Sequence, residues 1–526
     1  NTVYDDIRAL RPGGVVIHDQ DMKVDHALRD DHINYGVPFG SLVNEATDNA
    51  KLKKKVVNMI YVGVLAHLLD IDSAAIDQAV QKQFEGKEKV VKLNAEAIRI
   101  GRDWAAEHLT KQDPFVLSPV PGATEGKILI EGNNATALGA LMGGCTFLSW
   151  YPITPSSSVC ESLIDYFGAF RVKNDKNLYA AVQAEDEIAA IGMVLGAGWA
   201  GARAMTATSG PGISLMSELA GYAYYAEIPS VIVNVQRMGP STGLPTRNSQ
   251  GDLTSAYGLS HGDTQHIVLL PGNVEECYTM AQEAFDLAER FQTLVFLLSD
   301  LDLGMNTWMA EPFSYATQSL DRGKVLDAAA LDQVEQFHRY ADVDGDGIPY
   351  RTLPGTRNAK APYFTRGSGH NAQAKYTEKP DEWKAGLDRL SHKFATAAKA
   401  VPAPLLQVGD GHTDFALIAY GSTDVAMPEV LDMLQEKGVQ PDYLRLRALP
   451  FHPQVRAFIE AQDRVYILEQ NRDGQLLRLL AAEYPELAPR LRSVTHYDGT
   501  FVDALSLSHA VLSHENISPV EAIAHV

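Results

Sequence analysis

The chain has 526 residues, 45% of them hydrophobic, and a net charge of −21. At about 150 residues per domain, this length predicts three or four domains with large buried cores. The acidic balance argues against nucleic acids and anionic membranes as partners. The longest apolar stretches, 56–69 and 188–202, fall short of the ~18 residues that a membrane-spanning helix needs.

The three cysteines, Cys145, Cys160 and Cys277, include no Cys-x-x-Cys pair. They provide neither a disulfide framework nor, by themselves, a ligand set for zinc or an iron–sulfur cluster. We therefore expect a reducing, cytoplasmic setting and no metal site on this chain.

Two Pro/Gly-rich breaks, 113–122 and 401–411, are typical of linkers. They divide the chain into blocks near 1–112, 123–400 and 404–526. The first block alternates an expected strand with helices. Because it starts without a methionine, and a complete α/β unit should have an earlier strand, we expect this block to be N-terminally incomplete. Its expected elements are a strand at 14–18 and helices at 51–69 and 73–84.

The middle block alternates strands and helices, and this rhythm predicts an α/β fold with a parallel, doubly wound sheet. Its expected strands are 127–131, 179–183, 202–207, 230–235 and 293–298. Its expected helices include 185–200, 213–226 and 274–291. From 304 to about 399 the pattern is irregular, which indicates functional loops or covering segments.

The last block repeats the rhythm and predicts a second sheet of the same kind. Its expected strands are 415–420, 443–446 and 464–468, and its expected helices are 425–437 and 453–461. Ligands of such sheets bind at the carboxyl ends of the strands. In the middle block these ends are polar or rich in Gly and Pro, so we expect one site built from 151–158, 183–185, 206–212, 236–246 and 299–301.

The turn at 151–158 holds Pro152 and Pro155, which bar regular helix and strand pairing and make the backbone rigid. The hydroxyls of Ser156–Ser158 can cap the helix that follows. Thr154 lies between the prolines, where its hydroxyl can point at a ligand. On its own, the segment is more typical of a capped strand-to-helix turn.

Glu185 follows an expected strand and starts an expected helix, where a carboxylate is favoured by the helix dipole. Asp186 and Glu187 already serve that purpose, so Glu185 is surplus to capping. If it is buried against a ring, its pKa should rise, which would suit proton sharing.

Two further loops offer contacts for an anion. The loop 206–212 contains small residues throughout, so its backbone can approach a ligand closely; a tight turn is the alternative. Arg237 enters a Gly/Pro-rich loop at a strand end and can bind a carboxylate with two hydrogen bonds, or can simply be exposed to solvent.

Two patterns imitate cation sites. Asp342–Gly347 begins like a calcium loop, but the twelfth position is Leu353 instead of Glu, which favours a structural turn. Gly409-Asp-Gly411 imitates the start of the magnesium–diphosphate motif of thiamine enzymes. No Asn-Asn pair follows it, so it is not interpreted as that motif.

The order of five short motifs resembles the α subunit of the 2-oxoacid:ferredoxin oxidoreductases, most closely the 2-oxoglutarate type (2-oxoglutarate synthase). The motifs are Tyr-Pro-Ile-Thr-Pro-Ser (151–156), Gln-Ala-Glu (183–185), Thr-Ala-Thr-Ser-Gly-Pro-Gly (206–212), Asn-Val-Gln-Arg (234–237) and Gly-Pro-Ser-Thr-Gly-Leu-Pro-Thr (239–246). The resemblance continues through 260–263, 349–355 and 469–475. The first block resembles the γ domain that this family fuses ahead of α, at 11–16 and 58–63.

The resemblance implies three domains: a partial γ domain (1–112), the pyrimidine-binding domain of a thiamine diphosphate enzyme (123–400) and a transketolase C-terminal-like domain (404–526). Glu185 matches the glutamate that contacts the aminopyrimidine ring, and Thr154 and Arg237 match residues that hold the 2-oxoacid. The resemblance also implies that five residues line the cofactor beside Glu185: Pro152, Ile153, Thr154, Ser209 and Gly210.

The resemblance further implies a partner β subunit that carries the diphosphate site, Mg²⁺ and a [4Fe–4S] cluster. The site would then lie at an αβ interface, in an (αβ)₂ assembly that uses coenzyme A and ferredoxin in a reaction of the reductive TCA cycle. A distal substrate carboxylate needs a further partner, for which the candidates are Arg247, Arg351, Arg366 and His370. The alternatives are the same chemistry on pyruvate or branched-chain 2-oxoacids, and a non-catalytic partner subunit.

Overall fold

The structure is a computed structural model that describes residues 3–315, 317, 319–409, 413 and 415–518. The Gly409–Gly411 pattern therefore lies partly outside the described residues. Contacts divide the chain into two compact units, 1–125 and 126–521, each of which is described by itself. Among the described residues, no helix is both long and apolar enough to cross a bilayer.

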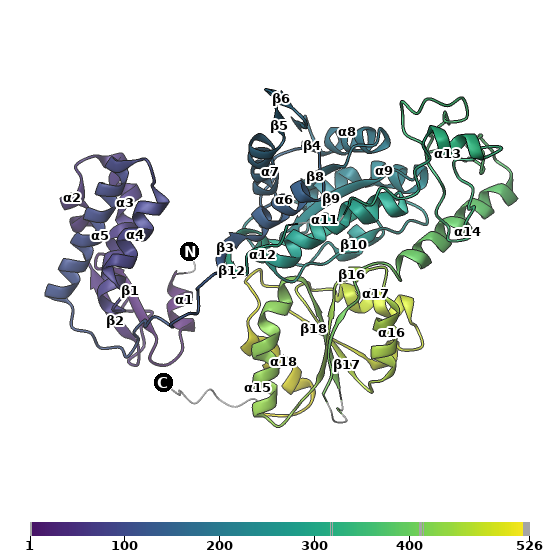
Figure 1. Cartoon of the computed structure of the whole chain (residues 1–526). Helices are drawn as coiled ribbons and strands as arrows, with labels where there is room; N and C mark the ends of the chain where they lie inside the picture. The colour runs from purple at the N-terminus through teal and green to yellow at the C-terminus, as the bar shows by residue number, and fades with distance from the viewer. Residues whose placement is uncertain (1–2, 316, 318, 410–412, 414, 519–526) are drawn as a thin grey trace. The chain divides into compact units, whose positions relative to one another are not determined.

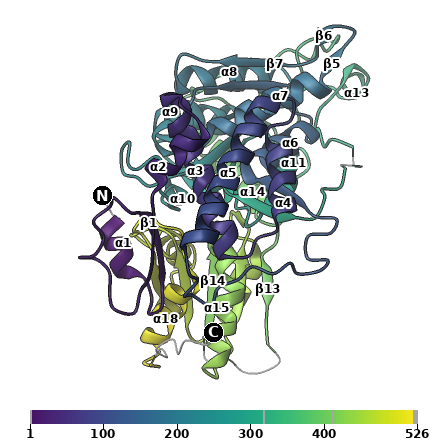
Figure 2. The same ribbon diagram turned by 90° about the vertical axis from the view of Figure 1, so that its left-hand side faces the viewer.

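The first unit packs helices against a small parallel sheet, in which β1 (Val15–Asp19) pairs with β2 (Ile33–Val37). The two longest helices, α3 (Ala50–Leu68) and α5 (Glu88–His108), run side by side (Figure 2). The strand predicted at 14–18 and the helix predicted at 51–69 are confirmed to within one or two residues. The remaining helices are α1 (Val3–Ala9), α2 (Phe39–Ala46) and α4 (Ser73–Gln83).

The second unit is built on a seven-stranded sheet with the order β16-β10-β11-β9-β8-β4-β7 (Figure 1). All neighbouring strands are parallel except β16, which pairs antiparallel with β10. The predicted α/β class with a parallel, doubly wound sheet is thereby confirmed. The strands are β4 (Phe147–Trp150), β7 (Ala180–Gln183), β8 (Ala204–Thr208), β9 (Ser230–Gln236), β10 (Ile267–Leu269), β11 (Leu294–Asp300) and β16 (Ala448–Leu449).

Helices cover both faces of this sheet. On one face, α8 (Glu187–Trp199) and α9 (Gly210–Ala226) pack through apolar side chains such as Ile191 and Met216. On the other face lie α6 (Gly132–Met142), α7 (Ser157–Phe170) and α11 (Val274–Phe291). The sheet is therefore buried on both sides, as a parallel sheet requires.

A second sheet of the same unit has the order β13-β15-β14-β17-β18 and is parallel except at β13. One of its faces shares a core with the α8–α9 side of the main sheet, through residues such as Ile418 and Phe296. Its strands are β13 (Leu405–Gln407), β14 (Ala416–Tyr420), β15 (Asp442–Leu446), β17 (Val465–Glu469) and β18 (Leu491–Thr495). Its helices are η1 (Gly421–Ala426), α15 (Met427–Glu436), α16 (Pro453–Glu460), α17 (Gln475–Glu483), η2 (Ala488–Arg490) and α18 (Ala504–His514).

Two expectations about the middle block were wrong. The strand predicted at 127–131 exists as β3 (Ile128–Glu131), but it pairs antiparallel with β12 (Thr307–Ala310) outside the main sheet. The irregular stretch from 304 to 399 contains a long helix, α14 (Pro380–Ala397). Most of its residues are polar, so its single apolar face was not recognised as helical in the sequence. The remaining short elements are β5 (Val172–Lys173), β6 (Lys176–Asn177), α10 (Leu253–Tyr257), α12 (Leu301–Met305) and α13 (Ala328–Gln333).

Candidate active site

The strand order brings the predicted loops together. β9, β8, β4 and β7 are consecutive in the sheet, so the loops after their carboxyl ends share one edge (Figure 1). The turn after β4 leads into α7, the loop after β7 leads into α8, and the loop after β8 leads into α9. This edge is where ligands bind in parallel α/β sheets.

The turn at 151–158 is held from within. Ser156 Oγ donates to the carbonyl oxygen of Ile153 at 3.0 Å, and Ser157 Oγ accepts from the Ile153 amide at 2.9 Å. Asn133 Nδ2 donates to the Pro155 carbonyl oxygen at 2.9 Å. The prediction that these serines cap α7 was wrong, because no side-chain cap bond forms at Ser156; the hydroxyls bind the turn instead. Thr154 stays exposed beside them.

Glu185 lies one residue beyond the end of strand pairing. The amide of Ala184 donates to the Trp150 carbonyl oxygen at 2.8 Å, and continuing the register of β4 and β7 brings Glu185 opposite Pro152 of the turn. Asp186 is the N-cap residue of α8 and accepts from the Ala189 amide at 2.7 Å. Glu185 is thus free of any capping duty, as predicted, and it is exposed in this chain.

Arg237 is the buried cation of the site, with 6% of its surface exposed. Its Nη1 donates to the carbonyl oxygen of Thr154 at 2.6 Å, and its Nη2 donates to that of Thr242 at 2.9 Å. Nε is buried and has no hydrogen-bond partner. Burial lowers the pKa of Arg237, and the carboxylate of Asp252 opposes that shift. The structure therefore brings Thr154 and Arg237 into contact, and no carboxylate of residues 3–315, 317, 319–409, 413 and 415–518 forms an ion pair with the guanidinium.

The loop after β8 meets the requirement for close backbone approach. Ser209 is fully buried and its Oγ has no partner, and no side-chain cap bond forms at the start of α9. Gly212 allows α9 to sit tightly on β8, because a Cβ there would lie 2.0 Å from Thr208 Oγ1. The small residues predicted for this loop thus serve packing as well as any ligand.

A cavity of about 590 Å³ opens beside Arg237. Its lining comes from the carboxyl ends of both sheets: Gly210, Arg237 and Asp252 on the main sheet, and Arg472 and Tyr497 on the second. The two sheets are tied together next to it, since the Gln250 amide donates to the Gln470 carbonyl oxygen at 2.7 Å.

Sequence reasoning missed Asp252, which lines this cavity close to Arg237. The one available signal was its place directly after Ser-Gln-Gly, at the start of the short helix α10. Arg247 follows the same Gly/Pro-rich loop and is exposed at this edge. Its backbone closes the loop, because its carbonyl oxygen accepts from the Met238 amide at 3.0 Å.

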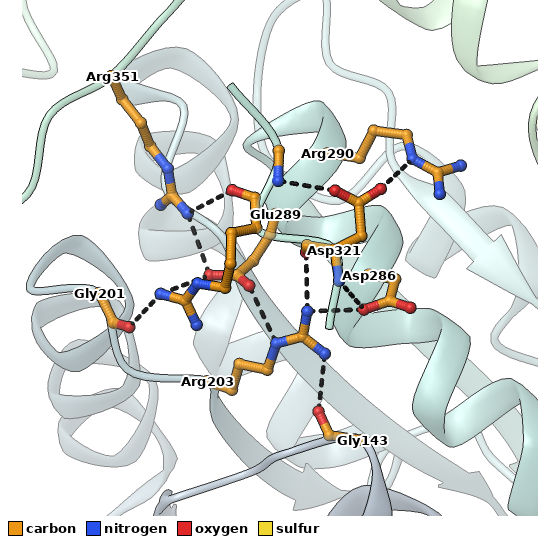
Figure 3. A network of polar contacts seen from close by, with 10 residues as sticks. Gly143, Gly201, Arg203, Asp286, Glu289, Arg290, Asp321 and Arg351 are labelled. Carbon is orange, nitrogen blue, oxygen red and sulfur yellow. Dashed lines mark hydrogen bonds and ion pairs between the residues drawn. The ribbon is translucent and has the colours of Figure 1, made fainter. Parts of the chain in front are cut away.

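Three candidates for the distal carboxylate lie at the opposite, amino edge of the sheet. Arg351 is buried and donates to Glu289 at 3.0 Å, in the turn of α11 that precedes β11 (Figure 3). Arg366 follows Thr365, which accepts from Trp199 at the end of α8. The His370 ring lies tilted against that of Tyr225, near the end of α9, with the ring centroids 4.5 Å apart. These three candidates therefore lie away from the carboxyl edge of the sheet, and Arg351 instead belongs to a buried ion-pair network.

That network joins four segments of the second unit (Figure 3). Glu289 accepts from Arg203 at 2.9 Å and from Arg351 at 3.0 Å, so one buried carboxylate serves two buried guanidinium groups. Arg203 also donates to Asp286 at 2.6 Å and to the Gly143 carbonyl oxygen at 2.7 Å. The network fastens the segment around 321–351 onto the sheet.

The calcium-like loop holds a lysine where a cation would sit. Lys324 Nζ lies 2.6 Å from Asp344 and 2.8 Å from Asp346, and it donates to the Ile348 carbonyl oxygen at 3.0 Å. Asp342 accepts instead from the amides of the loop. The loop is a structural turn, as predicted, and no cluster of metal-binding side chains occurs in the described part of the chain.

Comparisons with known proteins agree with this geometry. Residues 138–330 match the family "Pyruvate flavodoxin/ferredoxin oxidoreductase, thiamine diP-bdg", and residues 1–104 match the family "Pyruvate ferredoxin/flavodoxin oxidoreductase". The 2-oxoacid:ferredoxin oxidoreductase 2, subunit alpha, of Aeropyrum pernix is 36% identical over 81% of this chain and 67% of its own length. The 2-oxoglutarate synthase subunit KorA of Archaeoglobus fulgidus is 36% identical over 66% of this chain and 89% of its own.

A solved structure matches over almost the whole chain. It is titled as the 2-oxoglutarate:ferredoxin oxidoreductase from Magnetococcus marinus with 2-oxoglutarate, coenzyme A and succinyl-CoA bound. The match has a TM-score of 0.85 and 29% identity, and it covers 98% of this chain and 86% of that one.

A doubly wound sheet that matches a thiamine diphosphate-binding family model, together with its relatives, places the chain among the 2-oxoacid oxidoreductases. The chain belongs to the family of 2-oxoacid:ferredoxin oxidoreductases and corresponds to their α subunit, so the predicted resemblance is confirmed. It spans about two thirds of the length of its Aeropyrum pernix relative.

Proposed function

We propose that this chain is the γ-fused α subunit of an enzyme that interconverts 2-oxoglutarate plus coenzyme A with succinyl-CoA plus CO₂, using ferredoxin as electron carrier. The observation that carries the proposal is Arg237: a guanidinium with 6% exposure, bound to two neutral carbonyl oxygens, beside Thr154. Such a cation offers charge and unused N–H groups to a substrate carboxylate.

Thr154 and Arg237 would divide the work of substrate binding. The guanidinium would hold the carboxylate next to the carbonyl, and the exposed Thr154 hydroxyl would donate to the keto oxygen. Because Arg237 is itself fixed by the Thr154 carbonyl oxygen at 2.6 Å, the two groups keep a constant spacing.

The residues at this edge suit thiamine diphosphate. Glu185 presents an exposed carboxylate with no capping role, and Ser209 offers an unpartnered buried hydroxyl. Pro152 and Ile153 add exposed or half-exposed surface, and Gly210 adds an uncapped helix start. When bound, the cofactor supplies the carbanion chemistry of decarboxylation. Glu185 would hold a proton at the aminopyrimidine ring of the cofactor and would orient that ring.

A partner β subunit would complete the site. The diphosphate anchor, Mg²⁺ and a [4Fe–4S] cluster are proposed to lie on that subunit, because the described residues contain no metal-binding cluster and the three cysteines are buried and far apart in sequence. The exposure of Glu185 supports a site that closes only at an αβ interface. We further propose an (αβ)₂ assembly in the cytoplasm, in which the γ unit, residues 1–112, helps to cover coenzyme A.

The preference for 2-oxoglutarate rests on two arguments. The KorA relative is named a 2-oxoglutarate synthase subunit, and the matching structure binds 2-oxoglutarate. Arg247 is also exposed at the edge of the site as a cation for the second carboxylate of the substrate, whereas Arg351 is paired with Glu289.

The decisive experiment measures reduction of an artificial electron acceptor by the complete complex with coenzyme A and each acid in turn. We expect the highest kcat/KM with 2-oxoglutarate. Faster turnover of pyruvate or of a branched-chain 2-oxoacid would overturn the substrate assignment and leave the reaction class intact. Turnover by this chain alone would contradict the shared site.

A further inference from the structure

Arg237 is buried, and no carboxylate of the described residues lies within ion-pair distance of it. Both of its partners, the carbonyl oxygens of Thr154 and Thr242, are neutral. A buried cation is costly unless an opposite charge lies near it. The carboxylate that acts on Arg237 most directly is that of Asp252, although the two do not approach within ion-pair distance.

Asp252 is held firmly in place over the start of α9. Its Oδ2 accepts from Asn234 Nδ2 at 3.0 Å, and its amide donates to Gln236 Oε1 at 3.0 Å. A Cβ on Gly210 would lie 3.1 Å from both carboxylate oxygens, so the carboxylate rests against the glycine. Two side chains of β9, the strand that also delivers Arg237, therefore fix Asp252 at the wall of the cavity.

Among the described residues, Asp252 is the carboxylate whose charge acts on Arg237, and two of the other charges around this cavity pair with each other. Arg472 pairs with Asp473 at 2.7 Å, and both are largely exposed. The titratable groups that face Asp252 from the elements around it are Arg237, Arg472, Asp473 and Tyr497 in the cavity lining, Tyr420 on β14, and Glu187, which meets α9 at Gly212. None of these replaces Asp252 as the counter-charge of Arg237.

We infer that Asp252 is the counter-charge of Arg237 and that its carboxylate takes up one proton from solvent when a 2-oxoacid carboxylate binds to Arg237. An arriving carboxylate would otherwise add a second negative charge next to that of Asp252, which lines the same cavity as Arg237. Protonation of Asp252 removes the repulsion and leaves Arg237 paired with the substrate. Asp252 is thus a positioning residue that acts through Arg237, and this inference rests on the proposed function.

The electrostatics of Asp252 agree with this role. Burial raises its pKa, while the hydrogen bond from Asn234 and the charge of Arg237 lower it. An incoming anion that takes over the charge of Arg237 raises this pKa further. By linkage, KM for the 2-oxoacid should be low at pH values below the pKa of Asp252 in the free enzyme. KM should then rise with pH until the pH passes the pKa of Asp252 in the substrate complex.

The test compares the whole complex carrying wild-type Asp252 with Asp252→Asn, which keeps the hydrogen bond from Asn234. Between pH 5.5 and 8.5, KM of the wild type for 2-oxoglutarate should rise about tenfold for each unit by which substrate binding raises the pKa of Asp252. KM of Asp252→Asn should be flat and about tenfold lower at pH 8.5. Asp473→Asn, in the same cavity, should keep the wild-type slope.

A binding measurement makes the test independent of folding of the variant. The wild-type complex prepared without thiamine diphosphate is titrated with 2-oxoglutarate by calorimetry in buffers of different ionisation enthalpy. Uptake of up to one proton per site is expected, and it should vanish in Asp252→Asn. No uptake by the wild type, or equal uptake by both, overturns the inference. Because turnover of the complete wild-type complex is scored separately, failure of the proposed function remains distinguishable.

Discussion

Arg237 donates a hydrogen bond from Nη1 to the carbonyl oxygen of Thr154 at 2.6 Å, across the intervening end of β8. The residue proposed to bind the substrate carboxylate therefore also holds the turn that carries the residue proposed to bind the keto oxygen. A second bond, to the Thr242 carbonyl oxygen, fixes the loop after β9 in the same way. One buried side chain thus sets the spacing of two loops that the sequence separates by about eighty residues.

Replacement of Arg237 by alanine should lower kcat/KM for the 2-oxoacid by at least about a hundredfold, because charged hydrogen bonds to a carboxylate contribute roughly 1.5–3 kcal/mol each. Binding of thiamine diphosphate to the complex should persist. The matched control is Arg247→Ala, an exposed arginine at the same edge, for which a smaller effect restricted to dicarboxylic substrates is expected. Weakened cofactor binding with unchanged substrate use would contradict the assignment.

Replacement of Glu185 by glutamine should reduce kcat by about 10²–10⁴, the range for loss of a positioned proton-transfer group. The variant keeps the size of the side chain, and in the described part of the chain no hydrogen bond involves the Glu185 carboxylate, so assembly should be unaffected. Glu218→Gln, an exposed carboxyl on α9, is the control and should leave turnover unchanged. Wild-type turnover in Glu185→Gln would remove this residue from the mechanism.

The sequence predicted β7, β8, β9 and β11 of the main sheet because these strands are short, apolar and separated by helices with clear 3.6-residue patterns, but it did not predict β10 and β16. β9 and β11 are buried along their whole length and were located to within one or two residues. β3 was wrongly expected in the main sheet, because its apolar residues indicate that the strand is buried but not which strand it pairs with. α14 was missed because only one stripe of it is apolar, and Pro380 marks its start, not a loop.

The site was predictable where a residue type is unusual for its place, and unpredictable where the fold alone brings residues together. Thr154 between two prolines and Glu185 beyond its cap stand out in the sequence. Asp252 does not, because its importance comes from Asn234 and Gln236 on the preceding strand. Arg351 and Arg237 look alike in sequence, and only the sheet shows that they lie at opposite edges.

The buried network around Glu289 makes a stability prediction. Glu289→Gln should lower the free energy of unfolding by roughly 3–5 kcal/mol, because Arg351 would remain buried without its counter-charge and Arg203 would keep only the partly exposed Asp286. The exposed pair Arg456–Glu460 provides the control, and Glu460→Gln should cost at most about 1 kcal/mol. Denaturant unfolding of the full chain measures both. Equal effects of the two substitutions would contradict the structural role of the network.

The lysine in the calcium-like loop makes a prediction about metal addition. Because the ammonium of Lys324 already binds Asp344, Asp346 and the Ile348 carbonyl oxygen, Ca²⁺ should not raise the unfolding temperature of the wild type. Lys324→Met should destabilise the chain by about 1–3 kcal/mol, since it leaves these acceptors without their cation. Thermal unfolding with Ca²⁺ and with a chelator gives the comparison. A calcium-dependent rise in the wild type would show that the loop is not merely a turn.

Asp302 makes a prediction about pH. Burial and the neighbouring Asp300 raise its pKa to about 6, above the value in the unfolded chain. Its contribution to stability is therefore fully present below about pH 4 and is lost as the pH rises through about 6. Asp302→Asn keeps the acceptor for Asn306 and removes this titration. Relative to the wild type, the variant should gain roughly 2–3 kcal/mol between pH 4 and pH 7.5. Urea unfolding at both pH values, with the exposed Asp263→Asn as control, measures the difference. A constant difference between variant and wild type across this range would show that the Asp302 carboxyl does not change its protonation on folding.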